Sequence, residues 1–293
     1  MRNSITLIFV SICLGIYLQW SSNPLLLAIK SEVKHLAYYF IEKPMPEGTT
    51  NCNIENISTT QETDIMVVGH AYGSIHSKKG TISPYLQAYI ESSEFKPKTI
   101  IFTGDVLPST SNAKWKSFKE EMNTLGKKII ISPGNHDVGD GDSSQRDIYF
   151  QNFNVDYPLI IEDEERLMVF IDSTVENGKI NQDLIHNLEN YTGSSTTLFI
   201  FSHHILRPNP LLIANSTSNM DLNINNIKAL DAVKNNFINI ILISGDSGAY
   251  GQETNCIKNQ NISFISQGLG DFPHDKVLIL RGVQLFTQNI RKT

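Results

Sequence analysis

The stretch IISPGNHDVGDGD, Ile130 to Asp142, places an amide, an imidazole and a carboxylate side by side directly after an apolar run. A Pro-Gly pair separates the apolar residues from Asn135, His136 and Asp137. Short apolar runs that end at turn residues are typical of buried β-strands. Three polar residues in a loop can also form an ordinary turn, so their meaning depends on what the rest of the chain brings beside them.

Similar apolar runs alternate with longer, mixed stretches along the chain. The eight runs are residues 64–68, 99–102, 128–132, 166–172, 197–201, 238–244, 262–266 and 276–280. Three of the intervening stretches, 84–94, 114–125 and 181–191, carry apolar residues at helical spacing. Strands that alternate with helices predict an α/β fold with a largely parallel sheet and crossover helices.

Five of the runs end in residues that can bind a metal ion or transfer a proton. These residues are His70 and Tyr72, Asp105, Asn135 to Asp137, His203 and His204, and Asp246. In parallel sheets, ligands bind beyond the carboxyl ends of the strands. Singly, Asp105 or Asp246 could cap a helix, and His204 could be an ordinary core histidine. Together they predict one site, whose oxygen and imidazole donors suit divalent manganese, iron or zinc.

The order of these motifs resembles the calcineurin-like metallophosphoesterase family. The chain has GD at residues 104–105, GNHD at 134–137 and FSHH at 201–204, in the order that the family shows. The resemblance covers roughly residue 64 to the C-terminus. It implies a four-layer α/β/β/α sandwich, in which two mixed sheets lie between layers of helices.

The resemblance also assigns roles to individual residues. It implies that Asp105 bridges two metal ions and that Asn135 and His203 bind the second ion. It further implies that His136 is the general acid and that Asp137 orients it.

The first and last motifs depart from the family pattern. The family usually has Asp-x-His in the first motif, where this chain has His70 and Tyr72 in the sequence GHAYG. It usually has Gly-His-x-His in the last motif, where this chain has Asp246 and Gly248 in the sequence GDSG. An aspartate is therefore exchanged for histidine at one end of the motif set, and a histidine for aspartate at the other.

These exchanges affect the two expected metal positions differently. The second position keeps a full ligand set, namely Asp105, Asn135, His203 and Asp246. The first position keeps His70 and Asp105. Tyr72 is a poor ligand there because a phenol with a pKa of about 10 stays protonated near neutral pH. His76, in the same loop, is a further candidate ligand.

Three interpretations of the motif set remain open. The chain could hydrolyse phosphoesters with one metal ion, or fill both positions through rearranged ligands. It could also be a catalytically impaired relative that serves as a ligand-binding or assembly protein. Retention of the whole GNHD motif favours a phosphoesterase, in which metal-activated water attacks a phosphomonoester or phosphodiester and His136 protonates the leaving oxygen. Candidate substrate-binding residues are His204, Tyr72 and Arg207, although Arg207 could equally be a surface arginine.

The N-terminal residues predict a different environment from the rest of the chain. Residues 4–20 carry no charge, which indicates a signal-anchor or transmembrane helix over residues 1–22. A cleaved secretory signal and a buried core helix are the alternatives. Residues 23–63 are expected to form a spacer, free or docked, before a domain over residues 64–293. We therefore expect a membrane-anchored protein whose domain lies on the periplasmic or extracellular side, or a secreted one, acting on cell-envelope phosphoesters.

Cysteine content and charge restrict the environment and the partners. Cys52 and Cys256 could form a disulfide in an oxidising compartment, or could remain two free buried thiols. The formal net charge of −6 argues against a nucleic-acid partner, because binding phosphates requires a basic surface.

Overall fold

The computed structural model describes residues 49–73, 82–139, 142–175, 180–204, 229–247, 254–273 and 275–291. These residues belong to one compact unit, Glu47–Arg207 and Ser218–Thr293. The anchor predicted over residues 1–22, and the chain up to residue 48, lie outside the described residues. Within the described ranges, no helix has the length and apolar character needed to cross a membrane.

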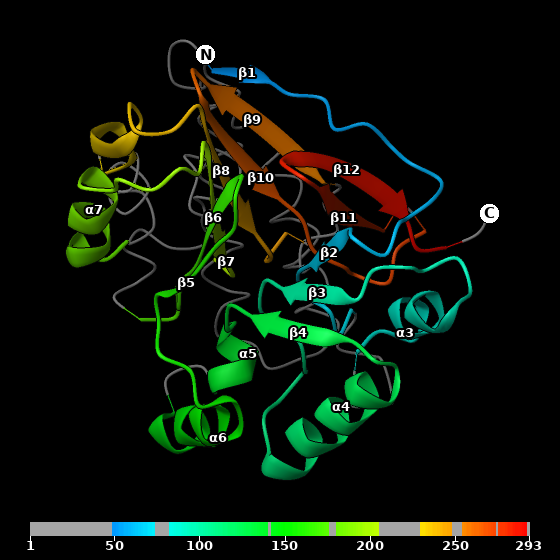
Figure 1. Cartoon of the computed structure of the whole chain (residues 1–293). Helices are drawn as coiled ribbons and strands as arrows, with labels where there is room; N and C mark the ends of the chain where they lie inside the picture. The colour runs from blue at the N-terminus through cyan, green and yellow to red at the C-terminus, as the bar shows by residue number, and fades with distance from the viewer. Residues whose placement is uncertain are drawn as a thin grey trace, which may run out of the picture. The chain divides into compact units, whose positions relative to one another are not determined.

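Two mixed β-sheets form the centre of this unit (Figure 1). The larger sheet has the strand order β1-β9-β10-β8-β7-β6-β5, and the smaller has the order β12-β11-β2-β3-β4. The larger sheet consists of β1 (Thr49–Asn51), β5 (Leu159–Glu162), β6 (Arg166–Phe170), β7 (Thr197–Ser202), β8 (Asn239–Ser244), β9 (Asn255–Asn259) and β10 (Ile262–Ser266). The smaller sheet consists of β2 (Ile65–Val68), β3 (Thr99–Phe102), β4 (Lys128–Ile131), β11 (Lys276–Arg281) and β12 (Gln284–Asn289).

Each sheet contains a block of parallel strands, and its other strands pair in antiparallel fashion. Strands β6, β7, β8 and β10 run parallel in the larger sheet, as do β2, β3 and β4 in the smaller one. Each of the eight apolar runs overlaps one strand, which confirms the predicted α/β fold. The strands that the sequence did not reveal are β1, β5, β9 and β12, all joined to their neighbours by antiparallel pairing.

Helices cover the outer faces of both sheets (Figure 1). The helices are α3 (Pro84–Glu91), α4 (Asn112–Thr124), α5 (Asn135–Val138), α6 (Ser143–Phe153) and α7 (Gln182–Glu189). Side chains of α3, α4 and α6 share a hydrophobic core with the smaller sheet, and those of α7 share one with the larger sheet. A third core joins Val67 and Ile101 of the smaller sheet to Phe170 and Phe201 of the larger one. The layers therefore run helix, sheet, sheet, helix.

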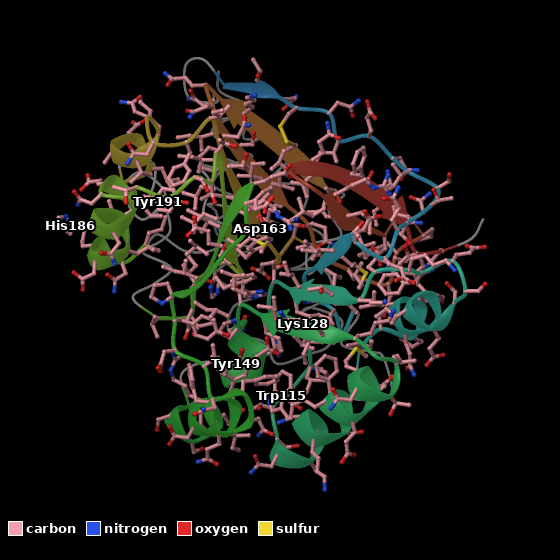
Figure 2. All side chains as sticks on the ribbon, in the orientation of Figure 1. Trp115, Lys128, Tyr149, Asp163, His186 and Tyr191 are labelled. Carbon is pink, nitrogen blue, oxygen red and sulfur yellow. A yellow bond between two sulfur atoms is a disulfide. The ribbon has the colours of Figure 1, made fainter. Side chains whose placement is uncertain are left out.

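The contact between α4 and α6 shows how the sequence produces this packing. The Ser111 side chain accepts a hydrogen bond from the Lys114 amide and caps the start of α4. Trp115 and Phe118, three residues apart, then lie on one face of the helix and are fully buried. The Trp115 ring meets Tyr149 of α6 edge to face, with centroids 5.6 Å apart (Figure 2). Helix α6 in turn contacts α5, the short helix that carries the last three residues of GNHD.

Residues 49–63 lie against the rest of the domain, so the docked form of the expected spacer describes these residues. Strand β1 pairs with β9, and the Ile57 amide donates a hydrogen bond to the Thr287 carbonyl at 2.8 Å. Cys52 and Cys256 form a disulfide between these two segments, visible as a yellow bond in Figure 2. The polar composition of residues 49–63 indicated a spacer, but their backbone groups complete the edge of a sheet.

Removing the disulfide should lower the stability of the domain substantially. It links residues 204 positions apart, so it restricts the unfolded chain strongly. We expect the double variant Cys52→Ser/Cys256→Ser to lose about 3–5 kcal/mol of unfolding free energy. Urea denaturation of both proteins without reductant measures this difference. Equal midpoints for the two proteins would show that the bridge does not form.

Candidate metal centre and active site

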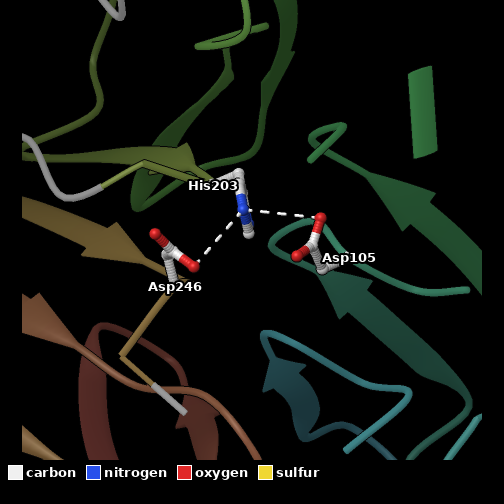
Figure 3. A group of neighbouring side chains, drawn as sticks. All are labelled: Asp105, His203 and Asp246. Atoms are coloured by element: carbon white, nitrogen blue, oxygen red, sulfur yellow. Dashed lines mark ion pairs between the residues drawn. The ribbon is translucent and has the colours of Figure 1, made fainter. Parts of the chain in front are cut away.

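Side chains from four strand ends converge at one edge of the two sheets. Asp105 follows β3, Asn135 begins α5 after β4, His203 follows β7 and Asp246 follows β8. Ligand atoms of Asp105, His203 and Asp246 all lie within 4.8 Å of one another (Figure 3). His203 Nε2 lies 3.5 Å from Asp105 Oδ1, 3.6 Å from Asp246 Oδ1 and 3.2 Å from Asn135 Oδ1. The structure thus brings together the four ligands predicted for the second metal position.

The His203 ring is oriented as a metal ligand requires. Its Nδ1 lies 3.2 Å from the Thr103 carbonyl oxygen, which can accept a hydrogen only from a protonated Nδ1. Nε2 then carries the lone pair and faces the two carboxylates. Histidines that bind metals commonly donate their other ring nitrogen to a carbonyl in this way.

His70 has the same arrangement on the other side of Asp105. Its Nδ1 lies 2.7 Å from the Leu269 carbonyl, and its Nε2 lies 3.9 Å from Asp105 Oδ2. The two oxygens of Asp105 therefore face different histidines, Oδ1 toward His203 and Oδ2 toward His70. Asp105 thus lies between the two histidines, and its bridging of two metal ions stays a prediction.

Two residues of the site have left-handed backbone conformations. His70 has a φ of 48° and Asp105 a φ of 54°, which are uncommon for residues other than glycine. The His70 amide donates to the Gly104 carbonyl at 2.9 Å, and the Tyr72 amide donates to the Asp105 carbonyl at 3.3 Å. Such conformations cost about 1–3 kcal/mol each and persist where surrounding contacts hold them. These contacts join the first motif loop to the second.

Two glycines allow the motif loops to approach this closely. A Cβ on Gly134 would lie 2.2 Å from Asp105 Oδ1, and a Cβ on Gly245 would lie 1.8 Å from the Thr103 carbonyl oxygen. Any side chain at either position would displace the loop that carries a metal-ligand candidate. Steric crowding therefore explains why glycine occupies position 134 of GNHD and position 245 of GDSG.

The electrostatics of the cluster favour a bound cation. Burial raises the pKa of Asp105, and burial together with the charge of Asp105 raises the pKa of Asp246 well above its usual range. Burial lowers the pKa values of His70 and His203, so both rings are neutral and keep a lone pair. A divalent ion would offset the repulsion between the carboxylates and accept the imidazole lone pairs.

His136 lies beside this cluster. Its backbone amide donates to Asp105 Oδ1 at 3.1 Å, and its ring Nδ1 lies 3.0 Å from the Pro108 carbonyl. That carbonyl fixes the ring and keeps a hydrogen on Nδ1, so Nε2 is the ring nitrogen that can exchange a proton. The half-buried ring also meets Tyr72 edge to face, with centroids 5.3 Å apart.

Among the described residues, Asp137 makes no hydrogen bond to the His136 ring, which corrects the orienting role expected for it. Its Oδ1 accepts from the Val106 amide at 3.0 Å and the Leu107 amide at 3.3 Å, and its Oδ2 accepts from the Gly134 amide at 2.9 Å. Burial, reinforced by the charge of Asp105, raises the pKa of Asp137 to about 8. Asp137 therefore ties the GNHD loop to the loop after Asp105, and Pro108 is the residue that orients His136.

Replacing Asp137 by Asn should test this structural role. The amide would offer one acceptor oxygen where the carboxylate offers two, which leaves at least one buried amide unpaired. We expect a loss of about 1–3 kcal/mol of unfolding free energy, measured by thermal or urea denaturation. Asp183→Asn, at an exposed position on α7, serves as the control. An unchanged stability of the Asp137 variant would mean that these hydrogen bonds are dispensable.

Some of the remaining predicted site residues lie beside the metal-ligand candidates, and others lie outside the described residues. Tyr72 lies between the rings of His70 and His136, and burial raises the pKa of its phenol above its ordinary value, so it remains protonated. His204 follows His203 directly, with ring centroids 4.9 Å apart. Arg207, His76 and Gly248 lie outside the described residues.

Several residues near the site were not identified from the sequence. Gln267 Oε1 accepts from the Gly69 amide at 2.8 Å and so supports the His70 loop from the end of β10. Asp172 and Ser173, beyond β6, contact Arg146 and His204. Their positions after strand ends were a usable signal, but their roles depend on backbone groups and neighbours that no motif encodes.

The chain belongs to the calcineurin-like phosphoesterase family. A family model for calcineurin-like phosphoesterases matches residues 73–221. The matched stretch contains Asp105, Asn135, His136 and His203. It leaves out the first and last motifs, which carry His70 and Asp246 and depart from the family pattern. The family comprises hydrolases of phosphoester bonds that are typically metal-dependent, and the donors present in this site fit a divalent ion.

The individual proteins that resemble this chain share low sequence identity with it. The chain is 26% identical over 142 residues to the probable glycerophosphodiester phosphodiesterase GpdQ of Arcobacter nitrofigilis, a match that covers 46% of this chain. The matched region spans 50% of that relative. The phosphopantetheinyl hydrolase of Mycobacterium tuberculosis is similar in structure, with a TM-score of 0.43 and 12% identity over 71% of this chain and 90% of that one. Vps29 of Chaetomium thermophilum has a TM-score of 0.36 and 9% identity over 76% and 83%.

Proposed function

We propose that this protein is a metal-dependent phosphoesterase that binds one divalent ion through Asp105, Asn135, His203 and Asp246. The observation that carries the proposal is the convergence of these four side chains beside the fixed ring of His136. Manganese, iron and zinc fit the mixture of carboxylate, amide and imidazole donors. A single ion is proposed because, among the described residues, the side of Asp105 that faces His70 offers few further donors.

The chemistry divides between the ion and the protein. A divalent ion in this position supplies positive charge that polarises a phosphoryl group and makes water more acidic. As an imidazolium, His136 then donates its Nε2 proton to the leaving oxygen and becomes neutral, while the Pro108 carbonyl keeps accepting from Nδ1. Asp105 accepts a hydrogen bond from the His136 amide. This hydrogen bond fixes the distance between the general acid and the metal ligands.

A phosphodiester is the preferred substrate class in this proposal. The name of the Arcobacter relative, a probable glycerophosphodiester phosphodiesterase, supports it, although the match spans half of that protein. The Cys52–Cys256 disulfide supports an oxidising compartment and therefore export. Together with the uncharged N-terminal stretch, it supports a membrane-anchored or secreted enzyme that acts on cell-envelope phosphoesters.

Hydrolysis of chromogenic esters tests the proposed activity. The purified chain, stripped with chelator and reloaded with manganese, iron or zinc, should hydrolyse bis(p-nitrophenyl) phosphate faster than p-nitrophenyl phosphate. The chelated protein should be inactive. A reloaded protein that holds metal but hydrolyses neither ester would contradict the proposal and favour a ligand-binding role, consistent with the two altered motifs.

A further inference from the structure

Tyr72 is a buried tyrosine whose hydroxyl makes no hydrogen bond within the described part of the chain. Other inward-facing tyrosines are paired, since the hydroxyl of Tyr89 bonds to Gln288 and that of Tyr149 bonds to Tyr157. A buried phenol usually finds such a partner, because leaving a buried polar group unpaired is costly. The Tyr72 hydroxyl is therefore free to bond a ligand that enters the site.

The ring of Tyr72 lies among the residues of the candidate active site. Its centroid is 4.2 Å from that of the His70 ring and 5.3 Å from that of the His136 ring. Burial raises the pKa of the phenol, and the nearby charges of Asp105 and Asp246, which Figure 3 shows, raise it further. The phenol therefore keeps its hydrogen near neutral pH and can donate it in a hydrogen bond.

A protonated phenol is a poor substitute for the histidine that the family pattern has at this position. Among the described residues, His70 Nε2 and Asp105 Oδ2, 3.9 Å apart, are the two ligand atoms on this side of the site. Catalytic zinc sites generally use three protein ligands. A metal ion on the His70 side of Asp105 would therefore lack a third ligand while Tyr72 is present.

We propose that Tyr72 takes the place of a second metal ion: its ring fills the His70 side of Asp105, and its hydroxyl donates a hydrogen bond to a phosphoryl oxygen of the substrate. This inference rests on the proposed function, because it assigns a contact to the substrate of that reaction. A second ion would offset negative charge on the phosphoryl group. A fixed hydrogen-bond donor provides stabilisation of the same sign without transferring its proton.

Replacing Tyr72 by His tests whether the residue excludes a second ion. The imidazole adds a third ligand to those of His70 and Asp105, so the full-length variant should bind about two equivalents of manganese, iron or zinc where the wild type binds about one. Elemental analysis after reloading measures the metal content, and circular dichroism shows whether the variant is folded. Tyr85→His, at an exposed position on α3, is the control and should keep the wild-type metal content.

Replacing Tyr72 by Phe tests the hydroxyl alone. Phenylalanine keeps the ring, so the metal content should stay at the wild-type value. The Kd of the metal-loaded protein for inorganic phosphate should rise about tenfold or more, since a hydrogen bond to a charged group is lost. Tyr89→Phe removes a buried hydroxyl that bonds to Gln288 and is the matched control, which should leave the phosphate Kd unchanged. Titration calorimetry measures these constants without turnover.

These measurements distinguish the inference from the proposed function. Weaker phosphate binding by Tyr72→Phe, in a protein that hydrolyses neither chromogenic ester, would uphold the inference and contradict the proposed function. Hydrolysis by the wild type with an unchanged phosphate Kd in Tyr72→Phe would overturn the inference and leave the proposed function intact. A folded Tyr72→His variant with the wild-type metal content, or a metal-loaded wild type that binds no phosphate, would also overturn the inference.

Discussion

Replacing His136 by Asn should lower kcat by about 10²- to 10⁴-fold without loss of bound metal. Asparagine keeps the backbone amide that donates to Asp105 Oδ1, so the metal ligands stay in place. It cannot deliver a proton to the leaving oxygen. Steady-state kinetics with bis(p-nitrophenyl) phosphate, together with elemental analysis, measure both quantities.

The leaving group makes this prediction more specific. A poor leaving group depends on protonation more than p-nitrophenolate does, so the loss in the His136→Asn variant should be larger for an alkyl phosphodiester. His186→Asn, at an exposed position on α7, is the matched control and should retain full activity. If the His136 variant kept wild-type kcat with both esters, another group would have to be the general acid.

Replacing Asp246 by Asn should weaken metal binding by about tenfold or more, because a charged ligand becomes a neutral one. The same change removes the repulsion between Asp246 and Asp105 in the metal-free protein. The metal-free variant should therefore be at least as stable as the metal-free wild type. The rise in Tm on adding metal should become smaller, since that rise depends on the ratio of metal concentration to Kd.

Titration calorimetry measures the Kd for the metal, and scanning calorimetry with and without metal measures the rise in Tm. Asp231→Asn, an exposed aspartate that pairs with Lys234, is the control and should show the wild-type response to metal. An Asp246 variant with wild-type metal affinity would exclude this residue as a ligand. The exchange of histidine for aspartate in the last motif would then have no part in metal binding.

The fold could be predicted from the sequence where burial is complete. Parallel strands such as β3 and β7 are covered on both faces, so they appear as continuous apolar runs. Strands β9 and β12 have mixed exposure and the sequences NCIKN and QLFTQN, which carry no such run. The docking of residues 49–63 was also hidden, because it depends on backbone pairing and a disulfide with partners about 200 residues away.

The motifs predicted the candidate site, but they did not predict the contacts that support it. Asp105, Asn135, His203 and Asp246 follow strand ends, and the topology brings those ends together. The orienting role of Asp137 was taken from the family resemblance, whereas its hydrogen bonds go to backbone amides. Successive residues of a helix point about 100° apart, so Asp137 of α5 faces the buried amides while the His136 ring reaches the Pro108 carbonyl.

The metal content of the purified full-length chain tests the proposed metal centre most directly. Elemental analysis after reloading and removal of excess metal should give about one equivalent of manganese, iron or zinc per chain, and His203→Asn should reduce it. Two equivalents would show that the His70 side of Asp105 also binds an ion and would contradict the single-ion centre. No bound metal under any reloading condition would contradict the centre itself.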